Sequence, residues 1–186
     1  MKNNILSTGF AVFVMVLLMI ATRSHISWLN AFVHLPDFTI PALFIAGVYF
    51  RKFWVAFVII LSAVAIDNYA IIEQGVSANC ITPAYSLLPL TYYGVFWASK
   101  YLNTLKIDAN IIKNALLIIA IASTQWLAAT ASYYAFTTSA WEKFPAYIAH
   151  WSVVEIPVVL YWMIAVIISF TLVPRVIPAL TLQKSV

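Results

Sequence analysis

Long apolar runs constrain this chain more than any other feature of its sequence. A helix needs about 20 mainly apolar residues to cross the hydrocarbon core of a membrane. Six apolar runs follow one another, interrupted by only two carboxylates: residues 5–22, 38–50, 53–72, 83–99, 114–136 and 152–173. We therefore predict an all-α integral membrane protein, built as a compact bundle of six transmembrane helices.

The second run, residues 38–50, is short for a membrane span. Because proline lacks a backbone donor, we expect this helix to begin upstream near Ala31 or to be irregular around Pro36 and Pro41. The first run is longer than the apolar region of a usual signal peptide, and no small-x-small cleavage site follows it. We therefore predict that it is a retained helix.

The composition excludes a water-soluble globule. Of the 186 residues, 64% are hydrophobic and 9% are charged, whereas soluble domains average roughly 45–50% and 25%. Six spans nearly use up the chain, so we predict a single domain over residues 1–186. The excess of four positive charges indicates membrane topology, and we predict a lipid bilayer and no nucleic acid as partner.

The basic residues predict the orientation in the membrane. If the N-terminus is cytoplasmic, all ten Lys and Arg residues except Arg23 and Lys143 fall on the cytoplasmic side. This asymmetry satisfies the positive-inside rule. It predicts that both termini are cytoplasmic, with outer loops at about residues 23–37, 73–82 and 137–150.

With this orientation, the residues able to do chemistry gather on the outer side. They are His25, His34, Asp67, Cys80, Tyr85, His150 and Glu155, accompanied by Trp28, Trp141 and Trp151. Tryptophans are also typical of the interfacial aromatic belt, and a carboxylate early in a helix is favoured by the helix dipole. The clustering nevertheless predicts a binding site that opens to the outside.

Asp67 is the strongest polar signal, because it lies inside the outer end of the third predicted helix. A carboxylate at such a depth costs several kcal/mol unless it meets a polar cavity or a partner. Ionisable residues within membrane spans usually serve function, so we predict a site role for Asp67. The alternative is a buried structural hydrogen bond, to Tyr69 or Tyr85.

Cys80 is the single cysteine of the chain. One cysteine excludes an intramolecular disulfide and metal sites that need several thiolates. A lone cysteine is often only a small apolar residue, but a thiolate in an outer loop suits a soft or borderline metal such as cobalt, copper or haem iron. A metal already held in a macrocycle needs only one axial ligand from the protein, so Cys80 fits a tetrapyrrole-like ligand better than a bare ion.

The six short helices, the cytoplasmic termini and the grouping of Asp67, Cys80 and Tyr85 resemble the substrate-binding S-components of energy-coupling-factor (ECF) transporters. More narrowly, the chain resembles the solitary vitamin B12 transporters of the BtuM type, which lie in the inner membrane of Gram-negative bacteria. The specific part of the resemblance is confined to the segment from Asp67 to Tyr85.

The resemblance implies uptake of cobalamin from the periplasmic side, with Cys80 as an axial ligand to the cobalt. It places Asp67 and Tyr85 beside the corrin, and we add His34 and Trp141 to the expected binding residues. It also implies removal of the cyanide ligand from cyanocobalamin. A donating thiolate on one face of cobalt weakens the bond on the opposite face, and Asp67 or Tyr85 would assist as proton donor or hydrogen-bond partner.

One departure concerns the first helix, where S-components that dock on a shared energising module carry an alanine-x-x-x-alanine stripe. Here the helix offers only Ser7, Gly9 and Ala11 near one end, followed by bulky residues. Close docking of another helix is therefore poorly supported on it. We expect a transporter that works without an obligatory ECF module.

Two other interpretations remain open at the level of the sequence. The first is an S-component-like transporter of another vitamin or of a transition-metal ion, with His25, His34 and Asp67 as the ligands. The second is a membrane-embedded hydrolase or thiol enzyme that uses Cys80 with a histidine as base. The chain has no Gly-x-Ser-x-Gly or His-Glu-x-x-His signature, which disfavours the second interpretation.

Overall fold

The computed structural model describes residues 2–23, 36–75, 83–104, 111–137 and 141–176. Every regular element within these ranges is helical, as the apolar runs predict. The α-helices are α1 (Lys2–Arg23), α3 (Thr39–Ile45), α4 (Phe53–Gln74), α5 (Leu88–Thr104), α6 (Ile111–Thr137) and α7 (Phe144–Val176). Short helical segments join them: a π-helix, η1 (Ala46–Phe50), and two 3₁₀ turns, η3 (Pro83–Leu87) and η4 (Trp141–Lys143).

Three of these helices contain segments long and apolar enough to cross a membrane. They are Phe53–Gln74 in α4, Ile112–Phe136 in α6 and Ser152–Phe170 in α7. Large apolar side chains on them stay exposed, among them Leu116 and Val153. Because apolar side chains on an outer surface favour lipid over water, the structure agrees with a multi-pass membrane protein.

The predicted helix over 38–50 is a buried core helix. Every residue of α3 is buried, and α3 packs against α4, α5 and α7. Together α3 and η1 form a short apolar helix, Thr39–Phe50, whose length of about 18 Å is well below the roughly 30 Å of a bilayer core. A helix that is apolar on all sides is stable only when other elements surround it, as they do here.

The irregularity expected around Pro36 and Pro41 is confirmed at Pro36, since residues 36–38 are not helical and the helix begins at Thr39. Pro41 is in the first turn of α3, where a missing backbone donor costs nothing. A second irregular segment is the π-helix η1, which ends where Arg51 adopts a left-handed conformation with φ of 54°. The backbone N–H of Arg51 donates to the carbonyl of Ala46 at 2.9 Å, so the chain reverses there directly into α4. A start near Ala31 lies outside the described residues.

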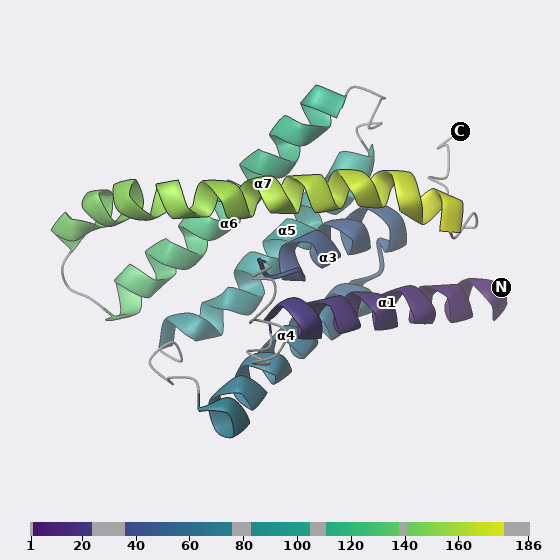
Figure 1. Cartoon of the computed structure of the whole chain (residues 1–186), viewed down its shortest axis with the longest axis horizontal. Helices are drawn as coiled ribbons and strands as arrows, with labels where there is room; N and C mark the ends of the chain where they lie inside the picture. Colours follow the sequence, from purple (N-terminus) through teal and green to yellow (C-terminus); the bar gives the residue numbers. More distant parts are fainter. Residues whose placement is uncertain (1, 24–35, 76–82, 105–110, 138–140, 177–186) are drawn as a thin grey trace.

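The helices run alternately between two ends of the bundle (Figure 1). On the right of that view α1 begins and α7 ends, and α5 also ends on this side. The opposite end, which we call the Asp67 end, holds the last turns of α1 and α4 and the first turns of α5 and α7. The first residues of α1 and the last residues of α7 thus lie on the same side of the bundle.

One close approach fixes the position of η1 on α5. A Cβ atom at Gly47 would lie 2.6 Å from the carbonyl oxygen of Phe96 and 2.6 Å from Cβ of Ser99. Both distances are shorter than real carbon contacts, and one of the two neighbours is backbone that cannot turn aside. Only glycine therefore permits η1 and α5 to pack at this separation.

We expect Gly47→Ala to lower the free energy of unfolding by about 1–3 kcal/mol, because the added methyl group forces η1 away from α5. The measurement is thermal unfolding of the purified protein in detergent. Gly9→Ala is the matched control, because a Cβ atom there meets nothing within 4 Å. Equal melting temperatures for the two variants would show that the packing of η1 on α5 is loose.

Candidate functional site

Arg23, the last residue of α1, binds the carboxylate of Asp67 on α4 through two hydrogen bonds. Its Nε donates to Oδ1 at 2.6 Å and its Nη2 donates to Oδ2 at 2.7 Å. The planar guanidinium matches a carboxylate in this two-point geometry, which makes such pairs stronger and more directional than pairs formed by lysine. Asp67 is therefore held by a protein cation at the Asp67 end of the bundle.

A second carboxylate, that of Asp37, approaches the same guanidinium from just before α3. The Nη1 group of Arg23 forms an ion pair with Asp37 and lies 3.3 Å from Oγ1 of Thr39 and 3.1 Å from the hydroxyl of Tyr92. Asp37 Oδ1 also accepts from the backbone N–H of Thr39 at 3.0 Å and from its hydroxyl at 2.7 Å. Aspartate favours such local bonds where a helix begins.

We call this group the Arg23 cluster. Its members are Arg23, Asp37, Thr39, Asp67, Tyr85 and Tyr92.

Further hydrogen bonds tie the cluster to the surrounding helices. The indole N–H of Trp162 on α7 donates to the backbone carbonyl of Asp37 at 2.7 Å. The hydroxyl of Thr22 on α1 accepts from the backbone N–H of Phe38 at 3.0 Å. The polar groups that the cluster brings into the bundle are thus largely satisfied, as a low-polarity environment requires.

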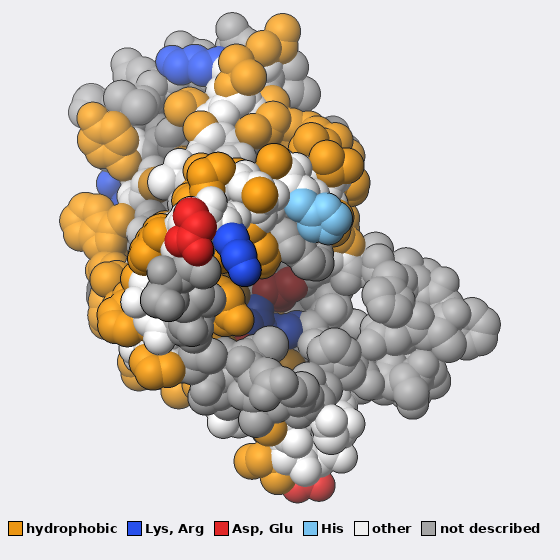
Figure 2. Space-filling model, turned by 90° about the vertical axis from the view of Figure 1, so that its left-hand side faces the viewer, with side chains coloured by type: hydrophobic (Ala, Val, Ile, Leu, Met, Phe, Trp, Pro, Cys, Tyr) orange, Lys and Arg blue, Asp and Glu red, His pale blue; other side chains and the backbone are white. Residues whose placement is uncertain are grey.

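The charged side chains of the cluster are largely removed from solvent. The exposed fractions are 13% for Arg23, 25% for Asp37 and 21% for Asp67. The view onto this end shows an acidic and a basic side chain recessed below the surrounding surface (Figure 2). Pairing with two carboxylates explains how Arg23 is tolerated on the predicted outer side, where the positive-inside rule disfavours it.

Two predicted site residues, Asp67 and Tyr85, lie in direct contact. The hydroxyl of Tyr85 in η3 donates to Oδ2 of Asp67 at 2.5 Å. Of the two hydrogen bonds considered for Asp67, the structure shows the one with Tyr85, whereas Tyr69 is 56% exposed. Both oxygens of Asp67 accept hydrogen bonds, so in this conformation Asp67 positions Arg23 and Tyr85.

Trp141 belongs to a separate aromatic group. Its ring centroid lies 6.0 Å from that of Tyr134 on α6 and 5.5 Å from that of Phe144 on α7. The structure thus does not bring Trp141 into contact with Asp67 or Tyr85. Such a group at the ends of two long helices matches an interfacial aromatic belt, which was the alternative to a binding role for Trp141.

The remaining predicted site residues, Cys80, His25 and His34, lie outside the described residues. Within the described ranges, no three or more His, Cys, Asp or Glu side chains form a group able to hold a metal ion. A ligand set for a bare ion made from described residues alone is therefore not available.

Two cavities lie between helices away from the Arg23 cluster. One, of about 340 Å³, lies between α5 and α6, and the other, of about 190 Å³, lies between α6 and α7. Neither is lined by Asp67 or Tyr85. Pockets for drug-sized ligands range from about 300 to 1,000 Å³, and a corrin with its nucleotide loop is larger still. A corrin would therefore need a space other than these two cavities.

Four residues of the cluster were not predicted from the sequence: Arg23, Asp37, Thr39 and Tyr92. The available signal was the position of Arg23, at the end of an apolar run and on the side where basic residues are scarce. A cation in such a place needs a carboxylate partner. The sequence alone does not indicate that Asp37 and Asp67 are both partners of Arg23.

Comparisons with known proteins do not assign a family. The chain matches no family model, and a search of curated proteins found no significant match.

Removal of Arg23 tests whether the cluster holds the Asp67 end together. We expect Arg23→Ala to lower the free energy of unfolding by about 3 kcal/mol, because two carboxylates are then left facing each other without their cation. Thermal or denaturant unfolding in detergent gives the measurement.

Lys143→Ala is the control for this experiment, since Lys143 is an exposed basic residue near the start of α7. Substitution of an exposed residue should change stability by at most about 0.5 kcal/mol. If both variants unfold alike, the ion pairs of Arg23 contribute nothing to stability.

Proposed function

We propose that this chain is a six-helix transporter that takes up cobalamin across the bacterial cytoplasmic membrane, as its resemblance to solitary B12-type S-components implies. In this proposal both termini are cytoplasmic and the Asp67 end faces outward. The alternation of the helices supports this orientation, since the start of α1 and the end of α7 lie on one side. Arg51 and Lys52, between η1 and α4, fall on the proposed cytoplasmic side.

The contact between Tyr85 and Asp67 carries the proposal. These residues were expected to share a site with Cys80, and two of the three meet at the Asp67 end. Cys80 is five positions before Tyr85, in the connection that leaves α4 at Gly75 and enters η3 at Pro83. In the proposal, a ligand bound at this end takes Cys80 as its sulfur ligand and lies near Asp67 and Tyr85.

In the proposed mechanism, the thiolate of Cys80 occupies one axial position of the substrate's cobalt. Cyanide on the opposite face leaves with the electron pair of its bond to cobalt, while the thiolate supplies a pair from its own side. Arg23 holds Asp67, and Asp67 in turn orients the hydroxyl of Tyr85. Because its single hydroxyl hydrogen is donated to Asp67, Tyr85 presents its phenol oxygen as a hydrogen-bond acceptor at the rim of the site.

We further propose that the transporter needs no obligatory energising module. The apolar surface of α1 carries large exposed side chains, including Phe10, Phe13 and Leu17. Small residues that would let a partner helix approach closely are few on this surface. The energy for transport would then come from a source other than an ECF module.

Transport of another vitamin or of a transition-metal ion is the alternative. The ligand set considered for a metal ion was His25, His34 and Asp67. Both oxygens of Asp67 already accept hydrogen bonds from Arg23 and Tyr85, so binding an ion would require this arrangement to open. The geometry of Asp67 thus supports cobalamin over a bare ion.

The absorption spectrum of the purified protein with cyanocobalamin tests ligand, ligation and chemistry together. In the native chain we expect the corrin absorption bands to be shifted by thiolate coordination. In Cys80→Ala we expect this shift to be lost, because the substitution removes the sulfur ligand.

Ser77→Ala is the matched control, since Ser77 lies in the same connection as Cys80. It should give the native spectrum. An identical spectrum for native protein and Cys80→Ala would exclude cobalt ligation by Cys80, and a colourless protein that retains a transition metal would favour the metal-ion alternative.

A further inference from the structure

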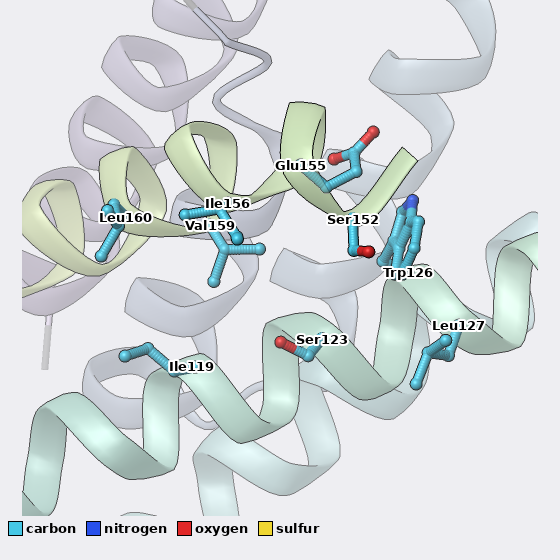
Figure 3. A pocket seen from close by; sticks show the side chains of 9 residues that line it. All are labelled: Ile119, Ser123, Trp126, Leu127, Ser152, Glu155, Ile156, Val159 and Leu160. Carbon is cyan, nitrogen blue, oxygen red and sulfur yellow. The ribbon is translucent and has the colours of Figure 1, made fainter. Parts of the chain in front are cut away.

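A pocket between α6 and α7 is polar at one end and aliphatic at the other (Figure 3). Its volume is about 190 Å³, and an apolar cavity of roughly 150 Å³ is enough to hold benzene. Glu155, Ser152 and Trp126 are grouped at one end together with Leu127, Ser123 lies between the two ends, and aliphatic side chains lie beyond it. The carboxylate of Glu155 is at the rim of the pocket and points away from α6. The aliphatic end contains Ile119, Ile156, Val159 and Leu160.

Glu155 lies within a segment apolar enough to cross a membrane, Ser152–Phe170. Across the pocket is Ser123, close to the middle of the apolar segment Ile112–Phe136 of α6. The carboxylate is therefore at membrane depth. No described residue forms a hydrogen bond or an ion pair with Glu155, whereas Asp67 has both Arg23 and Tyr85. Ionisable groups in such places are costly and are usually kept for function.

The neighbouring helices do not supply a cation to Glu155. The one charged residue in the sequence of α6 is Lys113, ten residues before Ser123, and this spacing corresponds to about 15 Å along a helix. α3, which also packs on α7, has no charged residue in its sequence. On α7 itself, the titratable residues within eight positions of Glu155 are His150, Tyr161 and Tyr147, and Tyr147 interacts with it electrostatically. Neither α3 nor α6 therefore brings a lysine or arginine near Glu155.

The other polar groups of the pocket fit a ligand that carries hydrogen-bond donors. The hydroxyl of Ser152 donates to the carbonyl of Ile148 at 2.6 Å, which leaves its oxygen able to accept. Ser123 offers a second hydroxyl from α6. The half-buried indole of Trp126 provides an aromatic wall that attracts cations.

We propose that this pocket binds a small amphipathic primary ammonium compound. The carboxylate of Glu155 is the counterion, the hydroxyls of Ser123 and Ser152 accept from the ammonium group, and the ring of Trp126 lies against it. The alkyl part occupies the aliphatic end, beside Val159 and Leu160. This site is separate from the Arg23 cluster and does not depend on cobalamin uptake.

The ammonium group has two possible sources, a soluble amine or the headgroup of an aminophospholipid. The pocket borders the lipid-facing surface, because Ile156 is 57% exposed and Leu160 is 43% exposed. The chemistry that recognises the ligand is the same for both sources. The composition of the bilayer distinguishes them.

Isothermal titration of the full chain in phosphatidylcholine nanodiscs with hexylammonium tests the proposal, with empty nanodiscs as the blank. We expect one saturable site, and binding of hexan-1-ol weaker by about tenfold or more, since the alcohol keeps the alkyl chain and lacks the charge. Glu155→Gln should weaken hexylammonium to the level of the alcohol. Glu73→Gln, at an exposed position near the end of α4, should not.

Equal affinity for hexylammonium and hexan-1-ol in the native chain would overturn the proposal, and this comparison needs no variant. Native affinity in Glu155→Gln would also overturn it. Nanodiscs that include phosphatidylethanolamine identify the source: weaker apparent binding of hexylammonium there indicates a lipid headgroup that competes for the site. Unchanged binding indicates a soluble amine. Neither outcome affects the absorption spectrum of the protein with cyanocobalamin, which tests ligation by Cys80.

Discussion

The ion pairs of Arg23 are the interaction on which the rest of the Asp67 end depends. A guanidinium at the end of an apolar helix is costly to desolvate, and two carboxylates from distant parts of the chain compensate it. In doing so they bring together the end of α1, the residues before α3, and α4. Tyr85 and Tyr92 extend the same hydrogen bonds to η3 and α5. The candidate site therefore has a rigid base built from charge pairs rather than from apolar packing.

The two carboxylates within the apolar runs have opposite surroundings. Asp67 is saturated by Arg23 and Tyr85, so its role in this conformation is to position other groups. Glu155 faces a pocket with hydroxyls and an indole but has no cation on the neighbouring helices. In a medium of low polarity, the arrangement around Asp67 is stable by itself, whereas the surroundings of Glu155 favour binding of a cationic ligand.

The helical class and most of the apolar segments were predictable, because membrane spans are recognised by run length and charge depletion. The contact of Asp67 with Tyr85 was among the alternatives considered, since both lie near the same end of adjacent predicted helices. The pairing of Arg23 with Asp67 joins residues 44 positions apart, which no local pattern encodes. The helix at 38–50 was predictable, but its burial in the core was not, because a buried core helix and a short span have the same apolar composition.

The glycine contact between η1 and α5 has a consequence for movement. At Gly47 the backbones of η1 and α5 approach so closely that a methyl group would not fit, so steric contact opposes sliding of η1 along α5. Rearrangements that carry a solute through the membrane must then occur at other joints, where side chains rather than backbones meet. The interfaces of α6 with α5 and with α7 each contain a cavity, so these interfaces have room to change.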